Sequence, residues 1–188
     1  MAVRGDHDGE SEGADSAPLQ WPSYAFTPGG CHSGPCDEVR QPYPAGSALT
    51  LDSWHHNSAY TRGIAYFNAG FYWEAHEMWE NVWLASKDVE RAERAVRTLI
   101  KLAACGVKAR QGMFGGVVKH LANARALVDV QCDDVNYGFS RTQLELIIER
   151  ITDWAADICG EKGIASGGTL ELDEGRLMPV ALRPLQPV

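Results

Sequence analysis

Apolar residues recur three and four positions apart along the middle of the chain, the spacing that places them on one face of an α-helix. The pattern predicts helices at about 53–69, 71–86, 88–111, 115–130 and 140–159. Gly70 and Gly112 follow the first and third of these, and glycine most easily takes the left-handed conformation that ends a helix. Because short connections favour antiparallel neighbours, we predict an all-α fold, a compact bundle of about five helices.

Two sets of polar residues mark expected helix starts. Asp88 precedes the third apolar stripe, where its carboxylate would accept a hydrogen bond from a free backbone N–H of the first turn. Ser140 and Gln143 have the spacing of a capping box, in which each side chain bonds the other residue's backbone N–H. They are expected to open the fifth helix.

The chain before the bundle has a different composition. Residues 1–20 are acidic and rich in Gly and Ser, which predicts disorder. Residues 21–50 carry several prolines, which exclude a long helix, and four aromatic residues from Trp21 to Tyr43, which need a surface to cover. We therefore expect an irregular arm that packs on the folded domain.

The helical domain itself is expected to span residues 51–160. Residues 161–188 contain Gly, Pro and the short sequence TLEL at 169–172. They are predicted to form a non-helical tail that either lies over the bundle or forms a brief strand.

Composition narrows the classes of partner. Seventeen basic and 25 acidic side chains give a net charge of −8, which argues against nucleic acid or an anionic membrane as a partner. No stretch approaches the ~20 apolar residues that span a bilayer, and the N-terminus lacks the apolar core of a signal peptide. The five cysteines are scattered and odd in number, as expected of reduced thiols, so a cytoplasmic protein is predicted.

The second predicted helix mixes tryptophans with acidic residues and a histidine. Residues three or four apart share a helix face, so His76 and Glu80 fall on the same stripe as Trp79 and Trp83. Any orientation that buries the tryptophans should therefore bury the imidazole and the carboxylates. A buried carboxylate needs a partner.

Basic residues on the next helices are the expected partners. Lys101 and Lys108 share a stripe of the third helix, and His120 lies among apolar positions of the fourth. We predict a pocket that binds a small polar ligand or supports acid–base chemistry, because a histidine near carboxylates titrates near neutrality. Its predicted residues are Glu74, His76, Glu77, Glu80, Trp73, Trp83, Lys101, Lys108 and His120, with Trp79 as a further wall. The residues do not define a reaction.

Two alternatives remain open at the level of sequence. The polar cluster could be structural, in a bundle that acts as an interaction scaffold and forms a homodimer. The sequence HEMWE also resembles half of the zinc-protease motif HExxH, so His76 and Glu80 could hold a metal for hydrolysis. No third ligand follows from spacing, and no cofactor is predicted. The cysteines of CHSGPC, residues 31–36, are read as incidental members of a loop.

The sequence FNAGFYWEAHEMWENVW resembles the signature of the family called domain of unknown function 309. The positions that carry this resemblance are Phe67, Asn68, Gly70, Tyr72, Trp73, Glu74, Ala75, His76, Glu77, Trp79, Glu80 and Trp83. The sequence LIKLAACGVKARQG, residues 99–112, resembles the second block of the family, with Lys101 in place of a glutamine, Lys108 in place of a histidine and Met113 in place of an asparagine. The resemblance covers about residues 60–127. It implies a compact helical bundle and no particular activity.

Overall fold

The computed structural model describes residues 19–36, 47–129, 136–161 and 178–185. Its elements are the 3₁₀-helix η1 (Trp54–His56) and the α-helices α1 (Ser58–Asn68), α2 (Tyr72–Ala85), α3 (Glu90–Arg110), α4 (Phe114–Asp129) and α5 (Arg141–Glu161). In this part of the chain there are five α-helices and no strand, so the predicted all-α fold is confirmed. Of residues 1–20, for which disorder was predicted, residues 1–18 lie outside the described residues, and so does the brief strand considered at 169–172.

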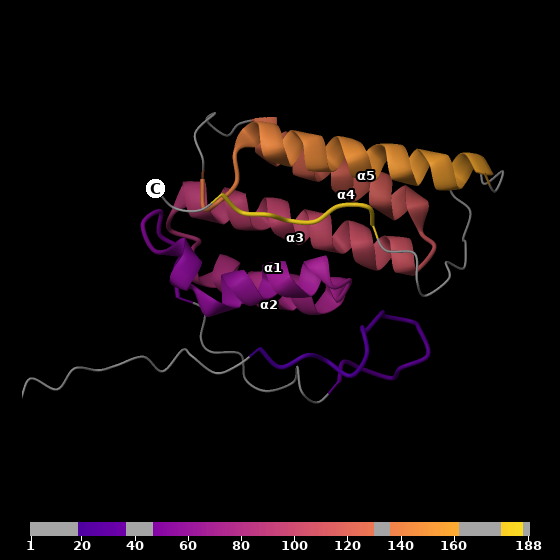
Figure 1. Ribbon diagram of the computed structural model, residues 1–188, viewed down its shortest axis with the longest axis horizontal. Helices are drawn as coiled ribbons and strands as arrows, with labels where there is room; N and C mark the ends of the chain where they lie inside the picture. The colour runs from indigo at the N-terminus through magenta and orange to yellow at the C-terminus, as the bar shows by residue number, and fades with distance from the viewer. Residues whose placement is uncertain (1–18, 37–46, 130–135, 162–177, 186–188) are drawn as a thin grey trace, which may run out of the picture.

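Each helix packs mainly on its neighbours in the chain, α1 on α2, α2 on α3, α3 on α4, and α4 on α5. Figure 1 shows α1 and α2 on one side, α3 and α4 beside them, and α5 at the opposite edge. This arrangement follows from the short connections, which return the chain along the helix that it has just left. None of the described helices is long and apolar enough to cross a membrane.

The helix ends test the predicted caps. Gly70 and Gly112 have φ angles of 84° and 67°, as predicted for residues that stop a helix. The capping box is also present, because Gln143 N donates to Ser140 Oγ (3.2 Å) and Ser140 N donates to Gln143 Oε1 (3.4 Å). The cap predicted at Asp88 is wrong. The backbone turns there, with Val89 N donating to Ser86 O, so the helix begins at Glu90 and no side chain caps it.

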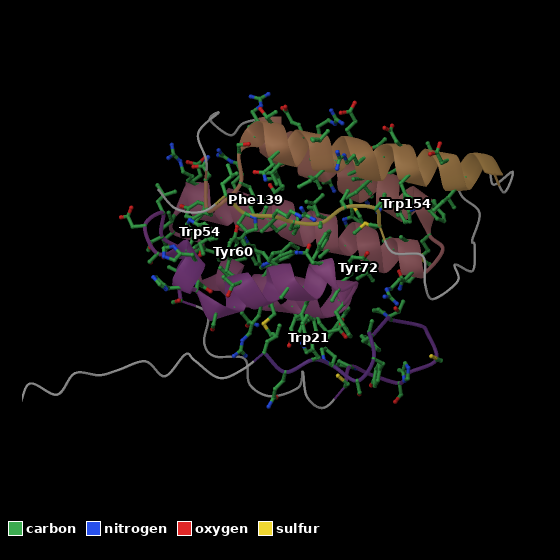
Figure 2. All side chains as sticks on the ribbon, in the orientation of Figure 1. Trp21, Trp54, Tyr60, Tyr72, Phe139 and Trp154 are labelled. Carbon is green, nitrogen blue, oxygen red and sulfur yellow. The ribbon has the colours of Figure 1, made fainter. Side chains whose placement is uncertain are left out.

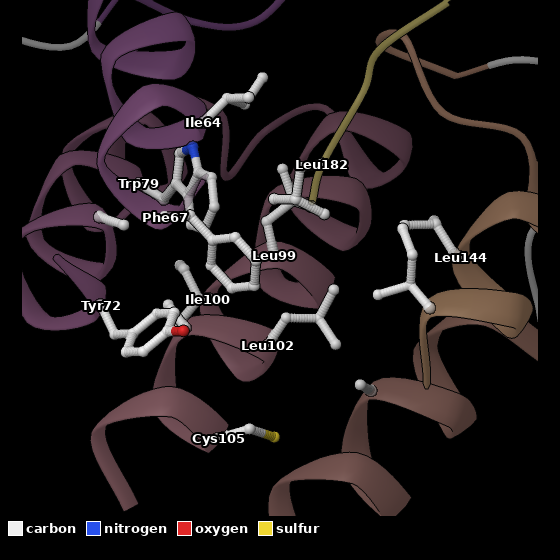
Figure 3. Close-up of a cluster of buried hydrophobic side chains, with 14 of the residues drawn as sticks. Ile64, Phe67, Tyr72, Trp79, Leu99, Ile100, Leu102, Cys105, Leu144 and Leu182 are labelled. Carbon is white, nitrogen blue, oxygen red and sulfur yellow. The ribbon is translucent and has the colours of Figure 1, made fainter. Parts of the chain in front are cut away.

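The core joins residues from distant parts of the chain. Figure 3 shows Phe67 and Trp79 facing Leu99 and Leu102 of α3, with Leu182 of the C-terminal segment beside them. All five of these side chains are buried.

The described part of the tail, residues 178–185, is tied to α1 and α2 by hydrogen bonds. Asn68 Nδ2 donates to Leu182 O (2.9 Å), and Leu182 N donates to Asn68 Oδ1 (2.7 Å). Met178 N donates to the hydroxyl of Tyr72 (2.9 Å). The described part of the tail therefore closes the core over the first two helices.

At the N-terminus, residues 19–36 form an extended arm that lies along α1 and α2 (Figure 1). The ring of Trp21 lies 5.8 Å from that of Tyr66 and 5.9 Å from that of Phe71, measured between centroids. The arm thus covers aromatic side chains at the junction of the first two helices.

A polar face on three helices

The rotation of α2 decides which of its polar residues are buried. Its core stripe is Tyr72, Ala75, Trp79 and Val82, at the spacing of one helix face. This orientation leaves His76, Glu77 and Glu80 half-buried, with side-chain exposures of 26%, 31% and 46%. The prediction that the tryptophans would carry these groups into the interior is wrong, because only Trp79 is fully buried, whereas Trp73 and Trp83 are partly buried.

The three tryptophans of α2 contact different parts of the molecule. Trp79 is fully buried, and its Nε1 donates to the carbonyl of Tyr60 (3.1 Å). The ring of Trp73 packs edge-on against Phe26 of the arm, with centroids 5.0 Å apart. Trp83 donates from Nε1 to Glu93 of α3 (3.2 Å). They therefore do not form the single pocket wall that was predicted.

The remaining polar residues form what we call the polar face: His76, Glu77 and Glu80 of α2, Lys101 and Lys108 of α3, and His120 of α4. Within it, His76 lies between two carboxylates. Its Nδ1 is 3.6 Å from Glu77 Oε1, and its Nε2 is 3.9 Å from Glu80 Oε1. These distances are longer than ordinary hydrogen bonds, so the imidazole is near both acids without being tightly bound by either.

His120 is the residue on which the three helices converge. Its Nδ1 is shielded from solvent and has no hydrogen-bond partner among the described residues. Burial lowers the pKa of His120, and the positive charges of Lys101 and Lys108 lower it further, with smaller contributions from His76 and Lys119. The imidazole is therefore held in its neutral form, with an unused polar atom. Lys119, the adjacent residue, was not among the predicted site residues.

The lysines do not balance the acids of α2 as predicted. Among the described residues, neither Lys101 nor Lys108 lies within ion-pair distance of Glu77 or Glu80. Lys108 Nζ instead donates to Gln111 Oε1 (2.8 Å) and contacts Met113 Sδ (3.7 Å). The stem of Lys108 crosses the first turn of α4. The absence of a side chain at Gly116 allows this, since a Cβ there would lie 2.9 Å from Lys108 Cδ.

Glu74 is separate from the polar face. It is fully buried, and its Oε1 accepts a hydrogen bond from the backbone N–H of Phe26 in the arm (2.8 Å). Burial raises the pKa of Glu74, against the opposing effects of the Phe26 and Glu74 backbone amides and of Arg110. Glu74 was predicted to lie in the same pocket as Glu77 and Glu80, but its carboxylate binds the N-terminal arm.

Cys105 lies on the same α3 stripe as the two lysines but cannot act as a nucleophile beside them. The side chain is fully buried, and its thiol donates to the carbonyl of Val117 (3.7 Å). Burial raises the pKa of Cys105 to about 12, so the thiolate, which is the reactive form, is scarce at neutral pH.

A metal could find three donor atoms on α2. The nearest donor atoms of His76, Glu77 and Glu80 all lie within 4.8 Å of one another. Three protein ligands with an open position are the usual arrangement of a catalytic zinc site. Glu77 would be the third ligand of such a site, which the i, i+4 spacing of His76 and Glu80 did not reveal. The ammonium groups of Lys101 and Lys108 oppose a cation in this region, because they add positive potential at the neighbouring His120.

The depressed pKa of His120 predicts a pH effect on stability. The ordinary pKa of histidine is 6.5. Below that pH the unfolded chain takes up a proton on His120 that the folded state excludes, so the free energy of unfolding decreases as the pH falls. We expect His120→Gln to lose less stability than the natural chain between pH 7.5 and 5.5. Urea unfolding midpoints of both proteins at the two pH values measure this. The other titrating groups cancel in the comparison, and parallel pH profiles would show that His120 is not shielded as described.

The family model for a domain of unknown function, DUF309, matches residues 60–120. The match begins in α1, ends in α4 and contains every residue of the polar face, and it confirms the resemblance predicted from the sequence. No curated protein and no solved structure matches the chain.

Proposed function

We propose that the segment matched by DUF309 carries a binding site for a small polar ligand, and that this site is the polar face of α2, α3 and α4. The observation that supports this most is the state of His120. A polar atom that is shielded from water and unpaired requires an explanation in a folded protein, and a ligand atom that bonds it is one. His120 is also the point where groups from three helices meet.

The charges of the face suggest the chemistry of the ligand. Lys101 and Lys108 create a positive potential around the neutral imidazole of His120, which favours an anionic group such as a carboxylate or phosphate. On the α2 side, Glu77 and Glu80 offer acceptors for a hydroxyl or amino group. A small molecule with an acidic group at one end and a hydrogen-bond donor at the other would match both the lysines of α3 and the glutamates of α2.

The arrangement would also allow acid–base chemistry on such a ligand. His120 is neutral and retains a free ring nitrogen, which is the state required of a general base. His76 lies beside two carboxylates, 3.6 Å from Glu77 Oε1 and 3.9 Å from Glu80 Oε1. Binding comes first in this proposal, and the reaction class would follow from the ligand that binds.

The proposal predicts that substitutions on the face remove binding and leave the fold intact. We would screen the full chain by thermal shift against inorganic phosphate, small carboxylic acids, free amino acids and Zn²⁺, then measure affinity for each hit by calorimetry. His76→Ala, Glu80→Ala and Lys101→Ala should each weaken binding roughly tenfold or more, because a hydrogen bond to a charged group contributes about 1.5–3 kcal/mol. The same variants should lose at most ~1 kcal/mol of stability, as is usual for partly exposed pairs.

Matched controls separate a site from a general charge effect. Lys87→Ala removes an exposed lysine near the far end of α2, and Glu145→Ala removes a paired glutamate of α5. Both should bind the hit as the natural chain does. If His76→Ala and Glu80→Ala unfold the protein, or bind as well as the controls, the cluster is structural. If Zn²⁺ is the only hit and Lys101→Ala strengthens its binding, the metal alternative is correct.

A further inference from the structure

We propose that Gln111 is a positioning residue of the polar face: its side-chain amide connects the N-terminal arm, residues 19–36, to Lys108, so that the docked arm holds this lysine ready for an anion. The inference rests on the proposed function, because it concerns the affinity of the polar face for an acidic ligand group. It adds a dependence on the arm, a segment that lies outside the residues matched by the DUF309 model.

Gln111 uses both ends of its amide. Its Oε1 accepts a hydrogen bond from Lys108 Nζ (2.8 Å), and its Nε2 donates to the carbonyl of Pro28 in the arm (2.7 Å). An ammonium group can only donate and a backbone carbonyl can only accept, so the two partners together fix which end of the amide faces each of them. Both bonds depend on the same rotamer of Gln111. Loss of either partner therefore releases the constraint on the other.

The end of α3 fixes the backbone of Gln111 relative to that of Lys108. Gly112 N donates to the carbonyl of Ala109 (2.9 Å), and Met113 N donates to the carbonyl of Lys108 (2.9 Å). These are the two bonds that close a helix around a left-handed glycine. Lys108 and Gln111 are three residues apart, a spacing at which side chains on a helix meet.

The arm presents the Pro28 carbonyl through a turn at residues 27–30. Gly30 N donates to the carbonyl of Thr27 (2.9 Å), and Gly29 has a φ angle of 80°. Proline at the second position and glycine with a positive φ at the third are typical of a type II turn. The carbonyl of the second residue makes no bond within such a turn, so the Pro28 oxygen is available to Gln111.

Other contacts dock the arm without any part of the polar face. Phe26 N donates to Glu74 Oε1 (2.8 Å), and the ring of Trp21 packs on that of Tyr66 with centroids 5.8 Å apart. Figure 2 shows Trp21 of the arm beneath α1 and α2. Because these contacts hold the arm in place, its carbonyl can impose an orientation on Gln111.

The bond to Gln111 orders the flexible side chain of Lys108 before a ligand arrives. The ammonium has three N–H donors, of which Gln111 Oε1 takes one, while Met113 Sδ lies at 3.7 Å. A donor therefore remains for a ligand oxygen while Lys108 stays bonded to Gln111. Lys108 is also close enough to His120 to lower the pKa of that imidazole, so its charge acts on the polar face. Ordering one flexible side chain in advance should raise anion affinity about two- to tenfold.

Hydrogen exchange of the Phe26 amide in the full chain, without ligand, tests the connection itself. Lys108→Met keeps most of the side-chain stem but removes the ammonium, so Gln111 loses the partner that orients it toward the arm. Protection of Phe26 should then fall about two- to tenfold, up to the value of one hydrogen bond. In a Gln111→Met background, the same substitution should change nothing further. The Leu49 amide, which donates to Ser86 Oγ, should exchange equally in all variants.

Calorimetry with inorganic phosphate tests the consequence for binding. Gln111→Met and Gly29→Ala should each weaken phosphate binding about two- to tenfold. Gly29→Ala acts from the arm alone: a Cβ there meets no other atom, but alanine is strained at a φ angle of 80°, which displaces the turn that carries the Pro28 carbonyl. Ser23→Ala, at an exposed position of the arm, is the matched control and should bind phosphate as the natural chain does.

Phosphate and the docked arm should also stabilise each other to a similar extent, as linkage requires. Saturating phosphate should therefore raise the protection of Phe26 in the natural chain and leave it unchanged in Gln111→Met. A Lys108→Met effect of equal size in both backgrounds, or none in the natural chain, would overturn the proposal. If the natural chain binds phosphate and both Gln111→Met and Gly29→Ala bind it equally well, only the positioning role is wrong. If the natural chain binds no phosphate, the proposed anion site is wrong, and this role fails with it.

Discussion

Trp79→Ala is expected to lower the free energy of unfolding by about 3–5 kcal/mol, the usual cost of removing a large buried aromatic side chain. Trp79 is fully buried between α1 and α3, and its indole N–H is bonded to the carbonyl of Tyr60. The substitution would leave both a cavity and an unpaired buried carbonyl. A melting temperature lower by about 6–20 °C should result, since each kcal/mol corresponds to roughly 2–4 °C in a domain of this size. Urea unfolding followed by far-ultraviolet circular dichroism measures the loss.

Trp83→Ala is the matched comparison, because it removes the same side chain from the same helix. Trp83 is half-buried, bonds Glu93 and lies 4.5 Å below the ammonium of Lys87. Its removal should cost only about 1–2 kcal/mol, the sum of a weak cation–π contact and a partly buried hydrogen bond. Equal losses in the two variants would mean that the rotation of α2 described above is incorrect.

Gly106→Ala is expected to destabilise the protein by about 1–3 kcal/mol, although alanine is the better helix former. A Cβ at position 106 of α3 would lie 2.2 Å from Tyr72 Cγ, a distance that side chains do not tolerate. The ring would have to shift, which disturbs the bond from Met178 N to its hydroxyl and its contact with Arg110. The cost of this overpacking exceeds the ~1 kcal/mol that alanine gains in helix propensity. Urea unfolding measures the net effect.

A double-mutant cycle assigns this loss to the contact. In a Tyr72→Ala background the ring is absent, so Gly106→Ala should cost nothing further and should recover part of the helix propensity. Gly115→Ala, at an exposed position in the first turn of α4, should change stability by no more than about 0.5 kcal/mol. If Gly106→Ala is equally harmful in both backgrounds, the strain arises elsewhere.

The expectations of a homodimer and of a cytoplasmic location are untested and stay predictions. So does the choice between a ligand site and a structural cluster. The experiments on His76, Glu80 and Lys101 address that choice directly.

The positions of the helices could be predicted because the signals for them are local. Apolar spacing, the stops at Gly70 and Gly112 and the capping box at Ser140 each involve residues within one or two turns, and each is present in the structure. The signature within α2 likewise lies in one short segment, and the family match covers it.

The sequence could predict the candidate site only as a set of residues. Tertiary contacts decided which of those residues lie together and which lie elsewhere. The residue spacing of α2 is compatible with several rotations of the helix about its axis. The indole of Trp79 packs closely against Gly63 of α1, and this contact selects a rotation that leaves His76 and Glu80 near the surface. Glu74 instead accepts a hydrogen bond from Phe26 of the arm, 48 positions away in the sequence. Periodicity within a helix contains no information about such a contact.

The sequence by itself therefore determined which segments are helical and which polar groups lie on them, because backbone conformation responds to neighbours in the chain. Only the tertiary structure decided which of these groups meet. Their burial and their charge depend on segments that are far apart in the sequence and adjacent only after folding, as His120 and Phe26 are to residues of α2.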